Sequence, residues 1–302
     1  MGSQVALADR LFGSSAPVLL RAWFGEQIER ITDPGFARRF SDHIVLPGVV
    51  PGDYNHRIVR SARGGLLGGI RFYGQDVTRP FVDIIAHDFE DWTALRACVA
   101  SEWAAFAPLH LRLLLAVGTT YPPGAHVDLT IHAARYCDMA PPDDRVTLRT
   151  FADAEEAVTM VAARYEDLAR TDPALARNVS PAAPDDLRRW HGEGRVRAIR
   201  AVTDDSAQIV GLFTAAPGSV EWIEGDQVNE EVVMGPFAGR GFAASAQRAW
   251  AARRDVDSYR FLVGTIDGLN VASRRSATRA GRGAVLDYVF LNFGAGCGEG
   301  MD

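Results

Sequence analysis

A short apolar run, a glycine-rich turn and an alanine-rich amphipathic segment follow one another between Val232 and Arg254. The run Val232 to Met234 is rich in β-branched residues, which suits a buried strand, and Pro236 cannot continue a hydrogen-bond ladder. From Phe242 onward, apolar residues recur at helical spacing with arginines on the other side. This stretch therefore predicts a strand, a loop and a helix in succession.

The turn between that strand and that helix contains Gly239, Arg240 and Gly241. Glycine lets the backbone come close to a ligand at the place where the first amides of the helix have no partner. A phosphate group could bind these amides and the positive end of the helix. The tripeptide alone fits better with a tight connection that binds nothing.

The residues that follow give the turn a context. Arg260 to Ile266 predicts another buried strand, and Val271 to Arg279 predicts a short helix that Gly281 ends. Asn270 stands directly before this helix. A last strand is predicted over Ala284 to Phe293.

This half of the chain resembles the GNAT superfamily of N-acetyltransferases. The family's acyl-CoA loop has the pattern [Q/R]-x-x-G-x-[G/A], and residues 238–243 (AGRGFA) match its glycine and its final small residue but place Ala238 where Gln or Arg is usual. A second family pattern, N-x-x-[A/S]-x(7)-G, matches Asn270, Ser273 and Gly281. The resemblance implies an acyl-CoA N-acyltransferase fold that uses acetyl-CoA as acyl donor.

The resemblance also implies where acetyl-CoA would bind. The thioester carbonyl would lie against the backbone N–H of Val233 or Met234, and the pantetheine would run between that strand and the one ending at Ile266, with Asn270 at the mouth of the split. The implied donor-binding residues are Val233, Met234, Gly239, Arg240, Gly241, Phe242, Ala243, Asn270 and Ser273.

Acetyl transfer to an amine also needs a base, because an alkyl ammonium group with a pKa near about 10.4 is mostly protonated at neutral pH. The candidates are Glu230 and Glu231, whose side chains must point to opposite faces of a strand. Many family members carry a tyrosine seven residues after the helix asparagine, but this chain has Ala277 there. The chain then resembles a subgroup of the family in which alanine is common at this position. This resemblance implies that Ser273 is placed to hydrogen-bond the sulfur of CoA.

The composition of the chain limits its class and its partners. A chain of 302 residues with 47% hydrophobic residues can form two domains, and a formal charge of -6 argues against a nucleic-acid partner. Cys98, Cys137 and Cys297 have neither disulfide-framework nor metal-ligand spacing, so no metal is expected. No stretch is apolar enough to span a membrane, and the N-terminus has no signal-peptide pattern. We expect a cytoplasmic protein, and its oligomeric state stays open.

The order of predicted elements repeats along the chain. Both halves show three strands, a helix and two more strands, and the polar linker at Met139 to Asp144 divides them. The pattern predicts an α/β protein with mixed sheets and two GNAT-like domains in tandem, over residues 1–140 and 141–302. In the first half the place of the phosphate loop is taken by Ala86 to Asp91, which has no glycine and three carboxylates. We expect that domain to be degenerate and without a CoA site.

The predicted function is acetyl transfer from acetyl-CoA to a primary amine of a small molecule or an aminoacyl group. Five carboxylates gather between Val220 and Glu231, which favours a positively charged amine as acceptor. Two alternatives stay open. The first is a catalytically idle acyl-CoA-binding or regulatory protein, as Ala238 and the missing tyrosine suggest. The second is an acyltransferase that uses another acyl-CoA in a biosynthetic pathway.

Overall fold

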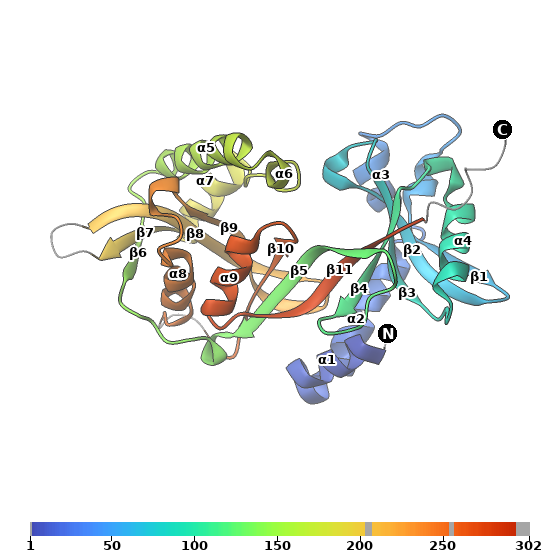
Figure 1. The fold of residues 1–302 in the computed structure, drawn as a ribbon, viewed down its shortest axis with the longest axis horizontal. Helices are drawn as coiled ribbons and strands as arrows, with labels where there is room; N and C mark the ends of the chain where they lie inside the picture. The colour runs from blue at the N-terminus through green and yellow to red at the C-terminus, as the bar shows by residue number, and fades with distance from the viewer. Residues whose placement is uncertain (1, 203–206, 254–256, 294–302) are drawn as a thin grey trace. The chain divides into compact units, whose positions relative to one another are not determined.

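The computed structural model describes residues 2–202, 207–253 and 257–293, so Arg254 and Cys297 lie outside the described residues. The chain divides into two compact units. Unit 1 comprises residues 1–128 and 286–302, and unit 2 comprises residues 129–285. The α/β class expected from the sequence is confirmed by the order of helices and strands (Figure 1).

Unit 1 begins with helices and continues with a sheet. Among its described residues, its helices are α1 (Gly2–Phe12), α2 (Ala16–Glu29), α3 (Pro34–Ser41) and α4 (Trp92–Glu102). Its strands are β1 (Arg57–Ser61), β2 (Gly64–Phe72), β3 (Pro80–His87), β4 (His110–Ala116) and most of β11 (Gly283–Asn292). No helix in the described part of the chain is both long and apolar enough to cross a membrane.

Unit 2 contains the elements that the sequence resemblance concerns. Its strands are most of β5 (Ala125–Arg135), β6 (Val146–Thr150), β7 (Val196–Val202), β8 (Ala207–Val220), β9 (Ile223–Val233) and β10 (Phe261–Asp267). Its helices are α5 (Ala154–Thr171), α6 (Pro173–Ala176), α7 (Pro184–Gly192), α8 (Phe242–Ala251) and α9 (Val271–Arg279).

The two units pair their strands in the same way. In unit 1, β1, β2 and β3 are antiparallel neighbours, β3 and β4 are parallel, and β4 is antiparallel to β11. In unit 2, β7, β8 and β9 are antiparallel neighbours, β9 and β10 are parallel, and β10 is antiparallel to β5. The pairing supports the internal repeat that the sequence predicts.

The last strand of each repeat comes from the other half of the sequence. In unit 1, β4 pairs with β11 from the end of the chain, and Leu286 lies opposite Ala116. In unit 2, β10 pairs with β5 from the first half, and Phe261 lies opposite Arg135. A prediction from sequence order assigns β5 to the first repeat and β11 to the second, because the apolar pattern of a strand does not identify the strand with which it pairs. The division into domains 1–140 and 141–302 stays a prediction, which a chain cut can test.

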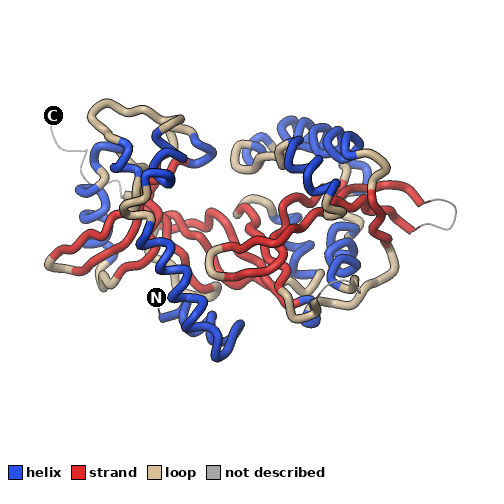
Figure 2. Tube along the Cα trace, turned by 180° about the vertical axis from the view of Figure 1, so that it is seen from behind, coloured by secondary structure: helices blue, strands red, loops and turns tan. Residues whose placement is uncertain are grey.

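Helices cover both faces of the unit 2 strands (Figures 1 and 2). On one face, Ala157 and Val161 of α5 and Leu187 of α7 pack against Leu212 and Val232 of β8 and β9. On the other face, α8 packs its small and aromatic side chains on β7, β8 and β10; this cluster includes Ala244, Ala246, Trp250, Ile199, Phe213 and Leu262. Burying such side chains contributes about 1.5 to 3 kcal/mol each for the larger ones. The two cores hold β9 between α5 and α8.

Strand β8 is longer than the sequence predicts, since it continues through Pro217 to Val220. The pairing with β7 ends at Thr214, so Pro217 needs no ladder hydrogen bond on that side and pairs with Asp226 on the other. Proline is tolerated at such an edge.

Candidate active site

Strands β9 and β10 pair at one end and part at the other. Their recorded pairing runs from Gly225 opposite Phe261 to Gln227 opposite Val263, while β9 continues to Val233. A β-bulge lies just beyond the last of these pairs, because Thr214 lies opposite Glu230 whereas Ala215 lies opposite Val228. The extra residue, Asn229, bends the strand. The backbone of the last residues of β9 therefore faces an opening that could accept an extended ligand.

The glycine-rich loop leads from this opening into α8. Gly239 and Gly241 have φ values of +76° and +84°, a left-handed conformation that glycine adopts without strain. Gly241 is the N-cap of α8, no side-chain hydrogen bond caps it, and the first turn has no acidic residue. The first recorded helical hydrogen bond from this turn runs from the Ser245 N–H to the Gly241 carbonyl. The amides before Ser245 are thus available to an anion, as the sequence predicts for this loop.

Arg145, directly before β6, contacts the same loop. Its Nη2 donates to the carbonyl oxygen of Arg240 at 2.6 Å, and its guanidinium lies 5.5 Å from the centre of the Phe242 ring. Arg240 is itself exposed, with its guanidinium 5.7 Å from the Phe237 ring. These arginines add positive charge beside the loop. No local motif marks Arg145, so the sequence does not predict it.

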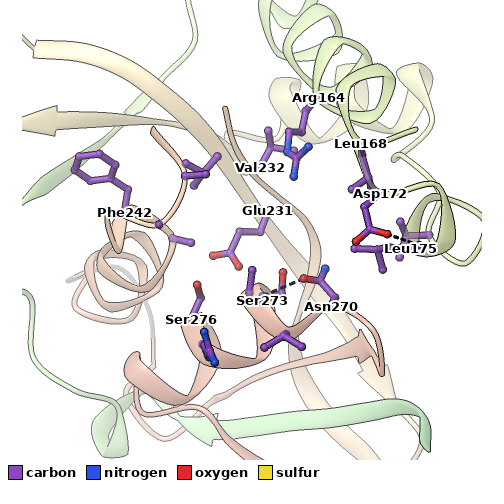
Figure 3. A pocket seen from close by; sticks show the side chains of 18 of the residues that line it. Arg164, Leu168, Asp172, Leu175, Glu231, Val232, Phe242, Asn270, Ser273 and Ser276 are labelled. Carbon is purple, nitrogen blue, oxygen red and sulfur yellow. Dashed lines mark hydrogen bonds between the residues drawn. The ribbon is translucent and has the colours of Figure 1, made fainter. Parts of the chain in front are cut away.

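A cavity of about 590 Å³ lies between the end of β9, the glycine-rich loop and the helices α5 and α9 (Figure 3). This volume is in the range of small-molecule sites. Residues from the sequence prediction that line it are Glu230, Glu231, Val233, Gly239, Gly241, Phe242, Ala243, Asn270 and Ser273. Lining residues that the sequence does not predict include Arg164, Tyr165, Asp172, Arg275, Ser276 and Arg279. The predicted site residues therefore come together, and Met234 and Arg240 stand beside the cavity without lining it.

Glu230 and Glu231 lie on opposite faces of β9. Glu230 faces α5 and the loop before α7, where its carboxylate accepts hydrogen bonds from the Ala182 N–H at 2.9 Å and the Tyr165 hydroxyl at 3.4 Å. Burial raises the pKa of Glu230, and these hydrogen bonds oppose the rise. This carboxylate ties a surface loop to the strand, which favours a structural role.

Glu231 faces α8 and α9, with its carboxylate in the cavity above Ser276 and beside Ser273 (Figure 3). Gln247 of α8 donates to both carboxylate oxygens, at 2.9 and 3.0 Å. Burial raises the pKa of Glu231 to about 7, although Arg282 and Gln247 both favour the ionised form. A carboxylate with a pKa near 7 can both accept and release a proton at neutral pH. Glu231 is the stronger base candidate of the two.

The backbone of β9 separates the two amides that the resemblance names. The Met234 N–H donates to the Val210 carbonyl at 2.9 Å, so it is engaged with β8. Because successive N–H groups alternate along a strand, the Val233 N–H points away from β8, toward the opening. Of the two, Val233 is the one placed to bind a ligand carbonyl.

Helix α9 begins beside the cavity. Asn270 is its N-cap, and its side chain accepts a hydrogen bond from the Ser273 N–H at 3.0 Å (Figure 3). This bond positions the Ser273 side chain at the cavity wall, one turn before Ser276. Ala277, where a tyrosine is common in the family, is fully buried and does not line the cavity. Tyr165 of α5 is a phenol that does line it, and burial raises its pKa.

The acidic hairpin between Val220 and Glu231 does not gather at the cavity. Asp226 is buried at the far end of β9, where it accepts a hydrogen bond from Tyr136 at 2.6 Å and pairs with Arg260 at 2.9 Å. Glu221 and Glu224 do not line the cavity either. The lining instead mixes acids with Arg164, Arg275 and Arg279. The electrostatic reason for expecting a positively charged acceptor therefore loses most of its basis.

In unit 1 the counterpart of the phosphate loop is filled by the protein's own carboxylates. Asp91 caps α4 by accepting hydrogen bonds from the Thr93 and Ala94 amides, at 2.9 and 3.2 Å. Asp88 accepts a hydrogen bond from the Gly65 N–H at 2.5 Å. The Thr93 and Ala94 amides, at the start of α4, are the ones that an incoming phosphate would need. That this half holds no CoA stays a prediction, and the capped start of α4 is the observation that favours it.

Solved structures of acetyltransferases are similar to this chain over most of its length. A GCN5-related N-acetyltransferase from Sphaerobacter thermophilus is 16% identical, with 83% of this chain and 84% of that chain covered and a TM-score of 0.46. A GNAT-family acetyltransferase from Colwellia psychrerythraea is 10% identical, with coverages of 85% and 94% and a TM-score of 0.43. A tandem GNAT protein from the clavulanic acid biosynthesis pathway is 14% identical, with coverages of 88% and 98% and a TM-score of 0.40.

These structures carry the superfamily name that the sequence motifs suggest. No protein-family model matches this chain, and no curated protein matches it either. Because all three TM-scores are below 0.5, we base the function on the cavity and the residues that line it.

Proposed function

We propose that the chain is an acetyl-CoA-dependent N-acetyltransferase that acts on a primary amine of a small molecule or an aminoacyl group. The observation that carries the proposal is the joining, in one cavity, of an uncapped helix start, the free end of β9 and the half-buried carboxylate of Glu231 with a pKa near 7. These are the parts that a pyrophosphate, an amide-bearing arm and an ammonium proton would each require.

The donor would bind along the loop and the strand edge. The amides at the start of α8 would hold the pyrophosphate, with Arg145, Arg275 and Arg279 contributing positive charge. Each helix-end contact contributes about 0.3 to 1 kcal/mol at an exposed site, so several amides must act together. The amide groups of the pantetheine arm would pair with the free edge of β9, as a further strand does.

Acetyl-CoA supplies an acetyl group that is activated as a thioester. The amine nitrogen bonds to the acetyl carbonyl carbon, the carbon–sulfur bond breaks, and Glu231 accepts the proton that the amine loses. The Val233 N–H donates to the carbonyl oxygen while negative charge builds on it, and the Ser273 hydroxyl donates to the departing sulfur. Glu230 holds the loop over the acceptor side.

The test is the release of free CoA thiol when the protein meets acetyl-CoA and a panel of amines, with acetylated products identified by mass spectrometry. The proposal requires thiol release that depends on one class of amine. No thiol release with any amine supports the idle acyl-CoA-binding alternative, and thiol release without an acetylated amine contradicts the proposal. Replacing acetyl-CoA with longer acyl-CoAs in the same assay tests the second alternative, an acyltransferase that uses another acyl-CoA.

Gly241→Val is expected to weaken CoA binding at least tenfold while leaving the chain folded. A β-branched residue is strained at a φ of +84°, and its Cβ would lie 3.1 Å from Arg145 Nη1 and displace that guanidinium from the loop. Calorimetry measures the CoA affinity. The matched control is Gly194→Val, since Gly194 also has a positive φ in unit 2 but does not line the cavity. Equal CoA affinity in both folded variants would contradict the phosphate role of the loop.

A further inference from the structure

Behind Glu231 lies a buried polar contact that the proposed reaction does not itself use. Gln247 is fully buried on α8, and its side-chain amide stands between Glu231 and Arg282. Arg282 Nε donates to Gln247 Oε1 at 3.2 Å. Since a guanidinium can only donate, the amide oxygen of Gln247 must face Arg282 and its NH₂ group must face Glu231. The arginine therefore fixes which way the amide points.

Three local features bring Arg282 to this place. Gly281 ends α9 in the left-handed conformation, with its N–H on the Thr278 carbonyl and the Arg282 N–H on the Ala277 carbonyl, which is a Schellman motif. A Cβ on Gly281 would lie 2.6 Å from the Ala140 nitrogen, so a side chain is excluded there. A Cβ on Gly264 of β10 would lie 2.9 Å from Arg282 Nη1. The absence of a side chain at Gly264 makes the space that the guanidinium occupies.

Arg282 is buried, with 2% of its surface exposed, and its Nη1 has no hydrogen-bond partner among the described residues. Burial lowers the pKa of Arg282 to about 10, which leaves it charged at neutral pH. A buried charge is costly unless an opposite charge compensates it. Glu231 supplies that opposite charge, and the Gln247 amide lies between the two groups.

We propose that Gln247 and Arg282 are positioning residues that orient the Glu231 carboxylate and favour its ionised, proton-accepting form. Gln247 occupies one side of the carboxylate with two hydrogen bonds, which leaves the remaining lone pairs directed into the cavity. Arg282 provides the charge and orients the amide. The inference rests on the proposed function for the use made of Glu231, but the contact itself can be measured without a substrate.

Other charged groups around Glu231 bear on its titration. Glu230 on the same strand raises the Glu231 pKa. The cavity wall adds Arg164 and Tyr165 from α5, and Arg275 and Arg279 from α9. Tyr136, near Arg282, favours the charged form of that arginine. The test must therefore compare variants that change Arg282 or Gln247 and leave this surrounding set in place.

The experiment is a titration of the Glu231 side-chain carboxyl by ¹³C NMR in the full chain, with its resonance assigned as the one absent from Glu231→Gln. In the wild-type protein we expect a pKa near 7. Arg282→Met and Gln247→Leu should each move it upward by about one unit, because each removes a group that favours the carboxylate. Gly264→Ala should move it in the same direction by displacing the guanidinium.

Arg248→Met is the matched control, since it removes a neighbouring arginine of α8 that contacts Asp143 and the Arg279 carbonyl rather than Glu231. An unchanged Glu231 pKa in folded Arg282→Met and Gln247→Leu, or an equal shift in the control, would overturn the proposal. If Arg282→Met does not fold, Gln247→Leu and Gly264→Ala decide.

A second readout connects the contact to turnover. If the protein transfers acetyl groups, the acid limb of kcat should move upward with the Glu231 pKa in the same variants, with the KM for acetyl-CoA unchanged. A chain that shows the NMR shifts but releases no thiol keeps this inference and loses the proposed function. A chain that releases thiol without the NMR shifts loses only the inference.

Discussion

Glu231→Gln is expected to lower kcat by about 10² to 10⁴ while leaving CoA affinity unchanged, because a positioned base contributes a factor of this size. The amide cannot accept the ammonium proton, but it keeps the shape of the side chain beside Gln247. The wild-type kcat should rise as the pH climbs through about 7, since Glu231 must be ionised to act. In the variant this rise should be absent. Steady-state kinetics across pH 5 to 9, on the amine found by the panel, measures both effects.

Glu230→Gln is the matched control for this prediction. Glu230 is engaged with Ala182 and Tyr165, so its loss should raise the acceptor KM more than it lowers kcat.

The thermal stability of Glu231→Gln supplies a further check. The pKa of Glu231 is higher in the folded chain than in the unfolded chain. The contribution of this carboxyl group to the free energy of unfolding is therefore present at acid pH and is lost as the pH rises through about 7. The variant should therefore gain stability over the wild type at pH 8 but not at pH 4. Full turnover in Glu231→Gln would remove this residue from the mechanism.

A chain cut after residue 140 is expected to abolish folding of both pieces. The piece 1–140 lacks β11, whose Leu286, Val289 and Leu291 are fully buried, and the piece 141–302 lacks β5, the partner of β10. Each buried side chain contributes about 1.5 to 3 kcal/mol, and a whole domain is stable by only about 5 to 15 kcal/mol. Circular dichroism and thermal melts of each piece measure the loss, and mixing the two pieces should restore the fold.

The piece 125–285 is the matched control, since it keeps β5 with β10 and retains every residue that lines the cavity. We expect it to fold and to bind CoA. If the piece 141–302 instead melts cooperatively and binds CoA alone, the strand exchange is not needed for folding and the predicted domains 1–140 and 141–302 hold as units.

The sequence predicts the site well wherever the signal is local. Gly241 at the start of α8, Asn270 at the start of α9 and Gly281 at its end each have a chain-local reason for their residue type, namely a left-handed turn, a cap or a Schellman motif. The bounds of α9 follow from these residues alone. The spacing of the two motifs then brings the predicted residues to one cavity.

The parts that the sequence does not predict depend on contacts between distant segments. The apolar patterns of strands β5 and β11 do not identify the strands with which they pair. Gln247 and Arg282 lie in an alanine-rich helix and after a helix end, where polar residues are usually solvated. Their contact appears only when α8 and β10 enclose it. The bulge at Asn229, which decides which face Glu231 occupies, is likewise set by pairing with β8.

A calorimetric titration of CoA into the full chain tests most directly the claim that the cavity of unit 2 binds the acyl donor. We expect one equivalent of CoA per chain, with the heat lost in Gly241→Val and retained in Glu231→Gln. One site follows because the amides at the start of α8 are open, whereas those at the start of α4 are held by Asp91. Two equivalents per chain, or no binding, would contradict the account.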